Sequence, residues 1–272
     1  MNSKVSQSIE TALGKVKSGD TVALGGNVLH RSPLGAVRAL IKMGLKDLTV
    51  IKTAGAHDVD LLCASNAAST VIAGFIGYET EFGLCDHFRK GVQAGEVEMK
   101  ENACYTVIAG LRASAYGIPF MPIMGMDGSD LVLEDRFRMV KDPYTGQEVV
   151  AVKALRPDFA ILHVQYADQY GNSKIQGPLY EDVLMASAAK SVIVTCEEIV
   201  DDEHFIHEPE LVNIPGFMVD KVVCLPGGSA PGSCANFYAI DGKALEAFKS
   251  IKDKQEVYDY IESYSSTDEG GI

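Results

Sequence analysis

A pair of glycines follows the first predicted strand of the chain, in the segment Leu24-Gly25-Gly26-Asn27. Because positions 25 and 26 carry no side chain, a ligand can approach the backbone closely there. The segment leads to a predicted helix that begins at Pro33. Free backbone amides and the amino end of a helix stabilise a phosphate, a carboxylate or a thioester oxyanion. We therefore expect Gly25, Gly26 and Asn27 to bind an anionic ligand, and a tight β-α turn is the alternative. The GxGxxG fingerprint is absent, which gives little support to nicotinamide cofactors.

Two further groups of residues are expected at the same place. His30 and Arg31 come just after the first loop, and an Arg side chain can bind a carboxylate through two parallel hydrogen bonds. We expect this pair to contact the substrate. The loop Gly227-Gly228-Ser229 follows a predicted strand from Lys221 to Leu225, which brings it to the same carboxyl edge of the sheet. We expect these three residues to bind the same ligand as the first loop, and a plain glycine-rich loop is the alternative.

An acidic segment holds the candidate for covalent catalysis. A carboxylate can attack an acyl group and form a covalent intermediate. Strand alternation places Glu96 and Glu98 on one face, while Glu101 lies past the strand end, where the chain turns into a helix. Glu101, flanked by the amide of Asn102, is therefore the predicted catalytic residue. In the alternative interpretation all three glutamates are solvated surface charges, and the helix dipole favours Glu101 at a helix start.

Other polar residues bear on substrate or metal binding. The segment from Gly74 to Gly83 follows another predicted strand, and we expect Tyr78 and Glu79 in it to line the substrate pocket. His204 and His207 lie in an acidic stretch without a defined third ligand, so no metal site is predicted. His163 lies on an apolar strand and is expected to be a core residue.

Strand-like and helix-like segments alternate along the chain, which predicts an α/β fold with an open, mostly parallel sheet covered by helices on both faces. Apolar residues at helical spacing predict helices over residues 9–16 and 34–41, with Ser32 as the cap of the second helix. The predicted strands are Thr21 to Leu24, Leu48 to Lys52, Val71 to Phe75, Phe159 to Val164, Val192 to Thr195 and Lys221 to Leu225.

Residues 1–264 are expected to form a single domain, with a hairpin attached to the main sheet over residues 136–154. Two short apolar or β-branched runs flank a turn sequence there, and the hairpin is a candidate flap or interface arm. A last helix is predicted over residues 244–262, followed by a flexible tail over residues 265–272.

Composition excludes several functional classes. The net charge of −13 and the scattered Lys and Arg residues argue against nucleic-acid binding. No apolar run approaches the roughly 20 residues of a membrane span, and the polar start lacks the layout of a secretory signal, so we expect a cytoplasmic protein without membrane contact. The six cysteines show no CxxC pair and mostly sit in apolar segments, which predicts reduced, buried thiols.

The most informative stretch of the chain runs from Ala154 to Pro178. In it an interior strand ends in a polar loop, residues 167–172, whose Asp, Gly and Asn residues predict a sharp turn at the place where open α/β sheets bind ligands. The stretch resembles the family I coenzyme A transferases, specifically the A (alpha) subunits of the glutaconate CoA-transferase type, and the resemblance covers nearly the whole chain. Further segments that carry it are Asp20 to Gly26, Gly83 to Gly91, Glu96 to Asn102, Gly117 to Phe120 and Asp142 to Gly146.

The resemblance implies a hetero-oligomer with a homologous B (beta) subunit that transfers coenzyme A from an acyl-CoA to a free carboxylic acid through an enzyme glutamyl-CoA thioester. In two-chain members the glutamate normally lies on the B subunit. This chain lacks the Ser-Glu-Asn-Gly run that presents it, and the nearest echo is Glu101-Asn102-Ala103. Coenzyme A or acyl-CoA is then a substrate, and no permanently bound cofactor is expected. The phosphates of coenzyme A are anionic and this chain has a net charge of −13, so a local basic patch or the second chain must bind them.

Alternatives remain open. A related branch resembles the ring-opening CoA hydrolases of steroid breakdown, which place the working glutamate on the A (alpha) chain, and Glu101 is the matching position. A non-catalytic subunit that supplies only pocket walls is the second alternative, and a sugar-phosphate isomerase has less support. The family's Gly-Gly-Ala-His-Pro-Ser loop has no His here, because Ala230 follows Ser229. The acid remains open as well: Arg31 is consistent with a dicarboxylic acid, and a 3-oxo acid is not excluded.

Overall fold

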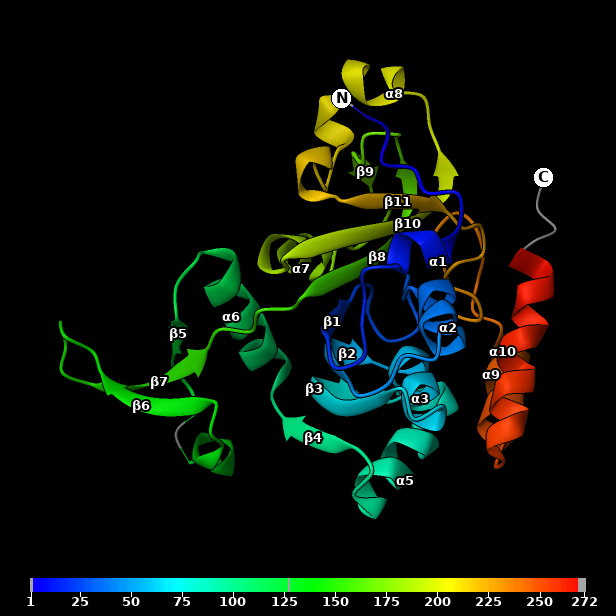
Figure 1. Ribbon diagram of the computed structural model, residues 1–272. Helices are drawn as coiled ribbons and strands as arrows, with labels where there is room; N and C mark the ends of the chain where they lie inside the picture. The colour runs from blue at the N-terminus through cyan, green and yellow to red at the C-terminus, as the bar shows by residue number, and fades with distance from the viewer. Residues whose placement is uncertain (1, 127, 269–272) are drawn as a thin grey trace.

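A computed structural model describes residues 2–126 and 128–268. Its main sheet has the strand order β11-β10-β8-β1-β2-β3-β4, all parallel, and the short β9 pairs antiparallel with β8 (Figure 1). All six predicted strands are present and four of them are longer than predicted. The strands of this sheet are β1 (Thr21–Leu24), β2 (Leu48–Gly55), β3 (Ala68–Ile76), β4 (Glu98–Glu101), β8 (Phe159–Ala167), β9 (Ser173–Lys174), β10 (Ser191–Ile199) and β11 (Lys221–Cys224).

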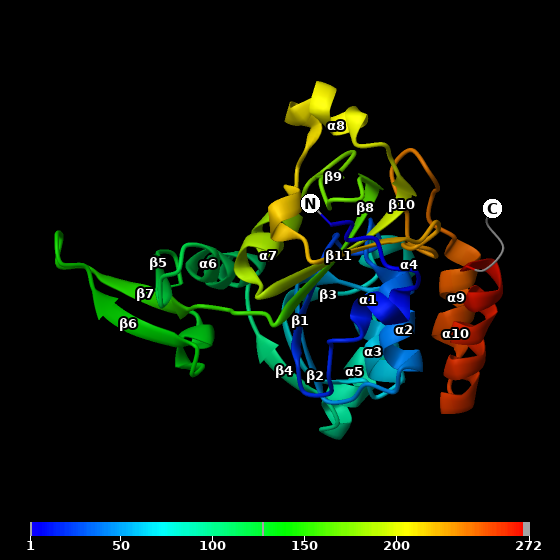
Figure 2. The same ribbon diagram turned by 45° about the horizontal axis from the view of Figure 1, so that its top comes forward.

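Helices cover both faces of this sheet, as predicted. In Figure 2, α6 (Cys104–Ala115) and α7 (Asp182–Ala188) lie on one side, and α1 (Ile9–Leu13), α2 (Leu34–Lys42) and α3 (His57–Ala64) lie on the other, with α5 (Asp86–Ala94) below. Each face has its own apolar core. In the described part of the chain, no helix combines the length and the apolar character needed to cross a membrane. The remaining helices are α4 (Glu79–Phe82), α8 (Glu203–His207), α9 (Gly242–Ser250) and α10 (Lys254–Asp268), and the 3-10 helices are η1 (Asp130–Leu133), η2 (Pro209–Leu211) and η3 (Gly216–Met218).

The predicted hairpin exists, but it does not belong to the main sheet. Strands β6 (Phe137–Lys141) and β7 (Glu148–Lys153) pair antiparallel, and β5 (Phe120–Ile123) pairs with β7 to complete a separate three-stranded sheet. Its inner side chains form a small core with Ala109 of α6, which attaches the sheet to that helix. The result is an arm that projects from the body of the molecule (Figure 1).

Three local predictions need correction. The expected last helix is two helices, because the chain leaves helical geometry at Ile251, and Asp241 caps the first of them by accepting the amide of Ala244. Helix α10 continues to Asp268, so the predicted tail begins four residues too early, and residues 269–272 lie outside the described residues. Ser32 does not cap α2: its hydroxyl donates to the carbonyl of Val28, and the N-cap position is Pro33.

The order of the strands defines one special place on the sheet. From β1 the chain builds β2, β3 and β4 outward on one side, then returns to place β8, β10 and β11 on the other side. At such a switch point the loops after neighbouring strands diverge, and open α/β sheets bind ligands in the crevice at the carboxyl ends. In this sheet the switch point lies at the carboxyl ends of β1 and β8.

Candidate active site at the carboxyl edge

The loop after β1 is a closed turn. The amide of Gly25 donates to the carbonyl of Ile161 (2.9 Å), that of Gly26 to Oδ2 of Asp182 (3.1 Å) and that of Asn27 to the carbonyl of His30 (2.9 Å). A Cβ on Gly25 would lie 2.6 Å from Oδ1 of Asp182, so packing requires this glycine. The predicted free amides are absent at these three positions, and the geometry matches the tight β-α turn of the alternative interpretation.

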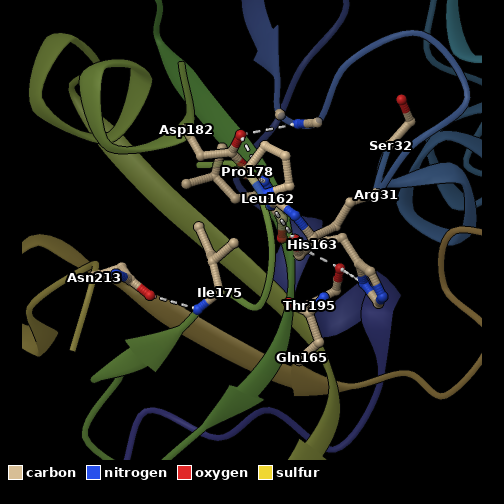
Figure 3. Close-up of polar contacts among 12 residues, drawn as sticks. Arg31, Ser32, Leu162, His163, Gln165, Ile175, Pro178, Asp182, Thr195 and Asn213 are labelled. Atoms are coloured by element: carbon tan, nitrogen blue, oxygen red, sulfur yellow. Dashed lines mark hydrogen bonds and ion pairs between the residues drawn. The ribbon is translucent and has the colours of Figure 1, made fainter. Parts of the chain in front are cut away.

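Arg31 forms a buried ion pair with Asp182. Its Nη1 lies 2.6 Å from Oδ1 of Asp182 and 2.8 Å from the carbonyl of His163, and its Nη2 donates to the carbonyl of Pro178 (3.2 Å) (Figure 3). The exposed fractions of the two charged side chains are 4% and 0%. A substrate carboxylate would have to displace Asp182 to use this guanidinium. The expected substrate contact of Arg31 is therefore not available in this geometry.

A second buried cation, Lys52, is a functional candidate that the sequence reasoning missed. Its ammonium group pairs with Oδ2 of Asp58 (2.9 Å), contacts Oγ of Ser32 (3.2 Å) and donates to the carbonyl of Gly25. The sequence feature that could have identified it is a single Lys inside the apolar run of β2. Lys52 and Arg31 together hold the β1 loop from both sides, Lys52 through a carbonyl and Arg31 through the Asp182 carboxylate that binds the Gly26 amide.

The loop after β11 packs onto a buried polar cluster. His163 lies 2.8 Å through Nδ1 from Oγ1 of Thr195 and 2.7 Å through Nε2 from Oε1 of Glu197. Tyr238 donates to the same Oε1 (2.5 Å), and the amide of Gly227 donates to Oε2 (2.8 Å). Burial acts to raise the pKa of Glu197, but these hydrogen bonds and the His163 ring outweigh it and lower that pKa below its usual value. His163 is thus a satisfied core residue, as predicted.

This cluster also includes Cys234, and within residues 2–126 and 128–268 the group His163, Glu197 and Cys234 is the one whose ligand atoms lie close enough together, within 4.8 Å, to hold a metal ion. Both carboxylate oxygens of Glu197 and both ring nitrogens of His163 already have hydrogen-bond partners. The group is therefore complete as a hydrogen-bond network.

The predicted ligand residues of the second glycine loop have structural partners as well. A Cβ on Gly228 would lie 2.6 Å from the His163 ring, so this glycine makes room for the imidazole. The amide of Ser229 donates to the hydroxyl of Tyr238 (2.9 Å), while the Oγ atom of Ser229 is buried without a hydrogen-bond partner among the described residues. The backbone of the loop therefore closes the cluster at the strand ends.

The predicted pocket residues lie apart from one another. Tyr78 is fully buried, donates to Asp60 (3.0 Å) and contacts His57 (3.0 Å), so it is a core residue and does not line an open pocket. Glu79 begins α4 and is exposed. His30 contacts Oγ of Ser233 (2.7 Å) and lines an open groove with residues of the loop before α9.

Glu101 lies at the expected edge, although it is the last residue of β4 and does not lie beyond it. Its register partner on β3 is Ala73, whose partner on β2 is Lys52, so Glu101 stands two strands from Lys52, about 10 Å away. The side chain is exposed, and in the described residues no hydrogen bond or ion pair holds its carboxylate. Arg136 binds only the backbone carbonyl of Glu101.

The polar loop after β8 makes the predicted sharp turn, and its Asp168 is used internally. Oδ1 of Asp168 accepts the amides of Tyr170 and Asn172 (2.9 Å each), and Oδ2 accepts the side-chain amide of Asn172 (2.7 Å). Gly171 has φ of +92°, which favours glycine. The carboxylate of Asp168 therefore shapes the turn and is not presented to a ligand.

The cysteines are expected from the sequence to be reduced and buried. In the structure all six are free thiols, but only four are buried. Cys104 is half-buried and Cys224 is exposed, so the prediction of burial is wrong for Cys224.

The chain matches the family model described as coenzyme A transferase over residues 6–225. It belongs to the coenzyme A transferase family. The match covers every strand of the main sheet, the β1 loop, Glu101, and His163 with its partners Thr195 and Glu197.

Individual relatives carry different chemistries. The chain is 34% identical to the A (alpha) subunit of glutaconate CoA-transferase from Acidaminococcus fermentans, over 92% of this chain and 84% of that protein. The crystal structure of that transferase matches with a TM-score of 0.89 over 94% of this chain and 86% of the other. The chain is also 31% identical to a cholesterol ring-cleaving hydrolase IpdA subunit of Rhodococcus jostii, over 96% of this chain and 92% of that protein. A variant of the decarboxylase AibA/AibB matches with 30% identity and a TM-score of 0.88, over 97% of this chain and 99% of the other.

Proposed function

We propose that this chain is the alpha subunit of a two-chain CoA-transferase that moves coenzyme A from an acyl-CoA to a free carboxylic acid. The observation that carries the proposal is the 34% identity to the alpha subunit of glutaconate CoA-transferase over 92% of the chain. The proposed partner is a homologous B (beta) subunit, with the active site between the two chains at the carboxyl edge of the sheet.

The proposed reaction proceeds through a glutamate. Its carboxylate oxygen attacks the thioester carbonyl, the CoA thiolate leaves, and a mixed anhydride forms. The thiolate then attacks the glutamyl carbonyl and releases the donor acid, which leaves a glutamyl-CoA thioester. The acceptor carboxylate repeats these steps in reverse order and departs as the new acyl-CoA, so bonds and charges balance over the cycle.

The nucleophile is proposed to lie on the partner chain. At the switch point the carboxylates of Asp182 and Glu197 are bound by cationic or hydrogen-bonding partners, and on the neighbouring strand Asp58 is paired with Lys52. A carboxylate held in this way is a weak nucleophile, because attack would break its bonds. These three carboxylates already hold the loops at the carboxyl edge, which supports a nucleophile on the partner chain.

The phosphates of coenzyme A are proposed to bind mainly to the partner. The net charge of this chain is −13, and its two buried cations at the edge, Arg31 and Lys52, each pair with an Asp. Measuring CoA binding to the isolated chain and to the two-chain complex tests this point. Tight binding to the isolated chain would contradict it.

The test of the main proposal is a transfer assay on the complex of this chain with its partner, using acetyl-CoA as donor and a panel of mono- and dicarboxylic acids as acceptors. The expected result is formation of a new acyl-CoA without free CoA accumulating, and no transfer by this chain alone. Release of free CoA in place of a new acyl-CoA would point to a hydrolase.

One observation favours a hydrolase as the second candidate: Glu101 is exposed at the carboxyl edge, with no partner for its carboxylate among the described residues. In that function its carboxylate acts as a general base on water or on a substrate proton. Glu101→Gln in the complex separates the candidates, with Glu96→Gln as the matched control because Glu96 is also an exposed glutamate. A hydrolase loses at least about 100-fold in kcat with Glu101→Gln alone. Full activity of both variants would leave this chain as a pocket-forming subunit.

A further inference from the structure

Two cysteines lie side by side on the last two strands of the main sheet. Cys196 of β10 and Cys224 of β11 are register partners in a parallel ladder (Figure 1). The register pair two residues earlier, Val194 and Val222, belongs to one apolar core, so alternation points both cysteines to that same face. Neighbouring strands are about 4.8 Å apart, and disulfides join Cα atoms that lie about 4.4–6.8 Å apart. The two positions are therefore close enough for a disulfide.

Both thiols lean into the space between the two strands. The Cys196 thiol donates to the carbonyl of Val223 on β11 (3.5 Å), and the Cys224 thiol donates to the carbonyl of Glu197 on β10 (3.7 Å). Each sulfur atom therefore contacts the strand opposite its own. Since both side chains also point to one face of the sheet, the two sulfur atoms face each other across a single gap.

The two cysteines differ in accessibility. Cys196 is fully buried, whereas Cys224 is exposed. Strand β11 is the last strand of the sheet, and the amino-terminal segment lies beside it only as far as Val222, whose carbonyl accepts the amide of Ser6. Cys224 lies beyond that contact. A small oxidant in solution can therefore reach Cys224, while Cys196 is shielded by the core.

The two thiols also differ in acidity. The hydrogen bond from the Cys196 thiol lowers the pKa of Cys224 to about 7, and a backbone hydrogen bond at Ile199 acts in the same direction, against burial and the carboxylates of Glu197 and Glu198. The contact with Cys224 and burial raise the pKa of Cys196 well above its usual value. Burial raises the pKa of each of the other four cysteines, Cys63, Cys85, Cys104 and Cys234. Cys224 therefore has the largest thiolate fraction near neutral pH, and the thiolate is the reactive form.

We propose that Cys224 is a site of reversible oxidation by hydroperoxides, and that Cys196 is the resolving thiol that converts the oxidised Cys224 to a disulfide. An accessible thiol poised next to a second thiol is the arrangement found in redox-sensitive cysteine pairs. The proposal goes beyond CoA transfer and does not depend on it.

The two steps balance with hydrogen peroxide as the oxidant. The Cys224 thiolate attacks one peroxide oxygen, the O–O bond breaks, hydroxide leaves, and the sulfur becomes a sulfenic acid. The Cys196 sulfur then attacks the sulfenic sulfur, the S–O bond breaks, and the thiol proton leaves with the hydroxyl group as water. The product is a disulfide between β10 and β11, which a dithiol reductant opens by thiol–disulfide exchange.

The resolving thiol protects a sensitive place in the fold. A sulfenic acid that is not resolved is oxidised further to charged sulfinic and sulfonic acids, which are in general not reduced again. Glu197 directly follows Cys196, and its carboxylate accepts the amide of Gly227 in the loop just after Cys224. The disulfide therefore keeps an added negative charge away from the contact that holds the second glycine loop.

Peroxide treatment of the full-length chain tests the pair. Trypsin cleaves after Lys221 and so separates the two cysteines. We expect a few equivalents of hydrogen peroxide to join the two resulting peptides through Cys196 and Cys224, with the loss of two hydrogen atoms, as mapped by mass spectrometry without reduction. Dithiothreitol should restore both thiols.

Three variants make the test specific. In Cys196→Ala the sulfenic acid should persist and be trapped by dimedone at Cys224, and Cys224→Ser should form no disulfide. Cys104→Ser is the matched control, because Cys104 is the other cysteine that is not fully buried, and it should leave the disulfide unchanged. Alkylation by iodoacetamide gives an independent measurement: at pH 7 Cys224 should react about 10-fold faster than Cys104. The pH midpoint of its reaction should rise in Cys196→Ala.

Several results would overturn the proposal. These are a disulfide between any other pair of cysteines, a dimedone label on a cysteine other than Cys224, or conversion of wild-type Cys224 to a sulfinic acid without a disulfide. Failure of Cys224 to react under conditions that oxidise free glutathione would overturn it as well.

Discussion

Two groups of polar residues stand at the same edge of one sheet, and they differ in kind. The loop-holding group, built around Arg31, Asp182 and Glu197, is buried and bonded on every charged side chain, and it fixes the glycine loops. By contrast, Glu181 at the same edge is only half-buried, and burial raises the pKa of its carboxyl. The loop-holding group indicates that side chains distant in sequence can hold a glycine-rich loop at a sheet's carboxyl edge.

The largest effect is expected from breaking the ion pair of the loop-holding group. Arg31→Leu leaves Asp182 buried without its cation, which should lower the free energy of unfolding by about 3–5 kcal/mol in urea titrations. The double variant Arg31→Leu/Asp182→Leu is the control and should recover most of this loss, because an apolar pair leaves no buried charge.

The same variant tests the substrate contact that the sequence predicts for Arg31. If the guanidinium is structural, any remaining activity of Arg31→Leu should fall equally with mono- and dicarboxylic acceptors. A loss of activity confined to dicarboxylic acids, with little change in the stability of the fold, would show that Arg31 binds the second carboxylate of the substrate.

A smaller effect is expected from Gly228→Ala. The added Cβ would meet the His163 ring at 2.6 Å and the carbonyl of Leu225 at 2.8 Å, so the strain should cost about 1–3 kcal/mol of stability. Gly14→Ala is the matched control: Gly14 has φ of −60°, its added Cβ meets neighbours at 3.4 Å, and its stability should change by less than about 1 kcal/mol. Equal melting temperatures for both variants would contradict the packing role of Gly228.

The most discriminating effect is a pH dependence of opposite sign for Glu197 and Glu181. Folding lowers the pKa of Glu197 from its usual 4.5, so its carboxylate stabilises the fold above that pH, and this contribution is lost as pH falls through the lowered value. Folding raises the pKa of Glu181 from 4.5, so its charged form opposes folding at neutral pH and stops doing so as pH falls toward 4.5.

Chemical unfolding of Glu197→Gln and Glu181→Gln between about pH 7 and pH 3 checks this contrast. At neutral pH the Glu197 variant should be less stable than the wild type, by about 1–3 kcal/mol, and the difference should shrink on acidification. The Glu181 variant should be at least as stable as the wild type at neutral pH, with a difference that closes as the pH falls. A parallel response of the two variants would remove the distinction between the groups.

The strands were predictable because each is a local apolar run with β-branched residues, and the turn at Asp168 was predictable because its hydrogen bonds lie within five residues. The role of the β1 loop was not. Its amide partner, Asp182, is 156 residues away from Gly26 in sequence, and no local pattern encodes that contact.

The most direct test of the proposed transfer is to locate the covalent intermediate. The two-chain complex is incubated with an acyl-CoA, any enzyme thioester is reduced with borohydride or cleaved with hydroxylamine, and the modified residue is mapped by mass spectrometry. We predict one modified glutamate, on the partner chain, with this chain unmodified. Modification of Glu101 would contradict the placement of the nucleophile, and acyl-CoA turnover without any modified residue would contradict transfer through a glutamyl thioester.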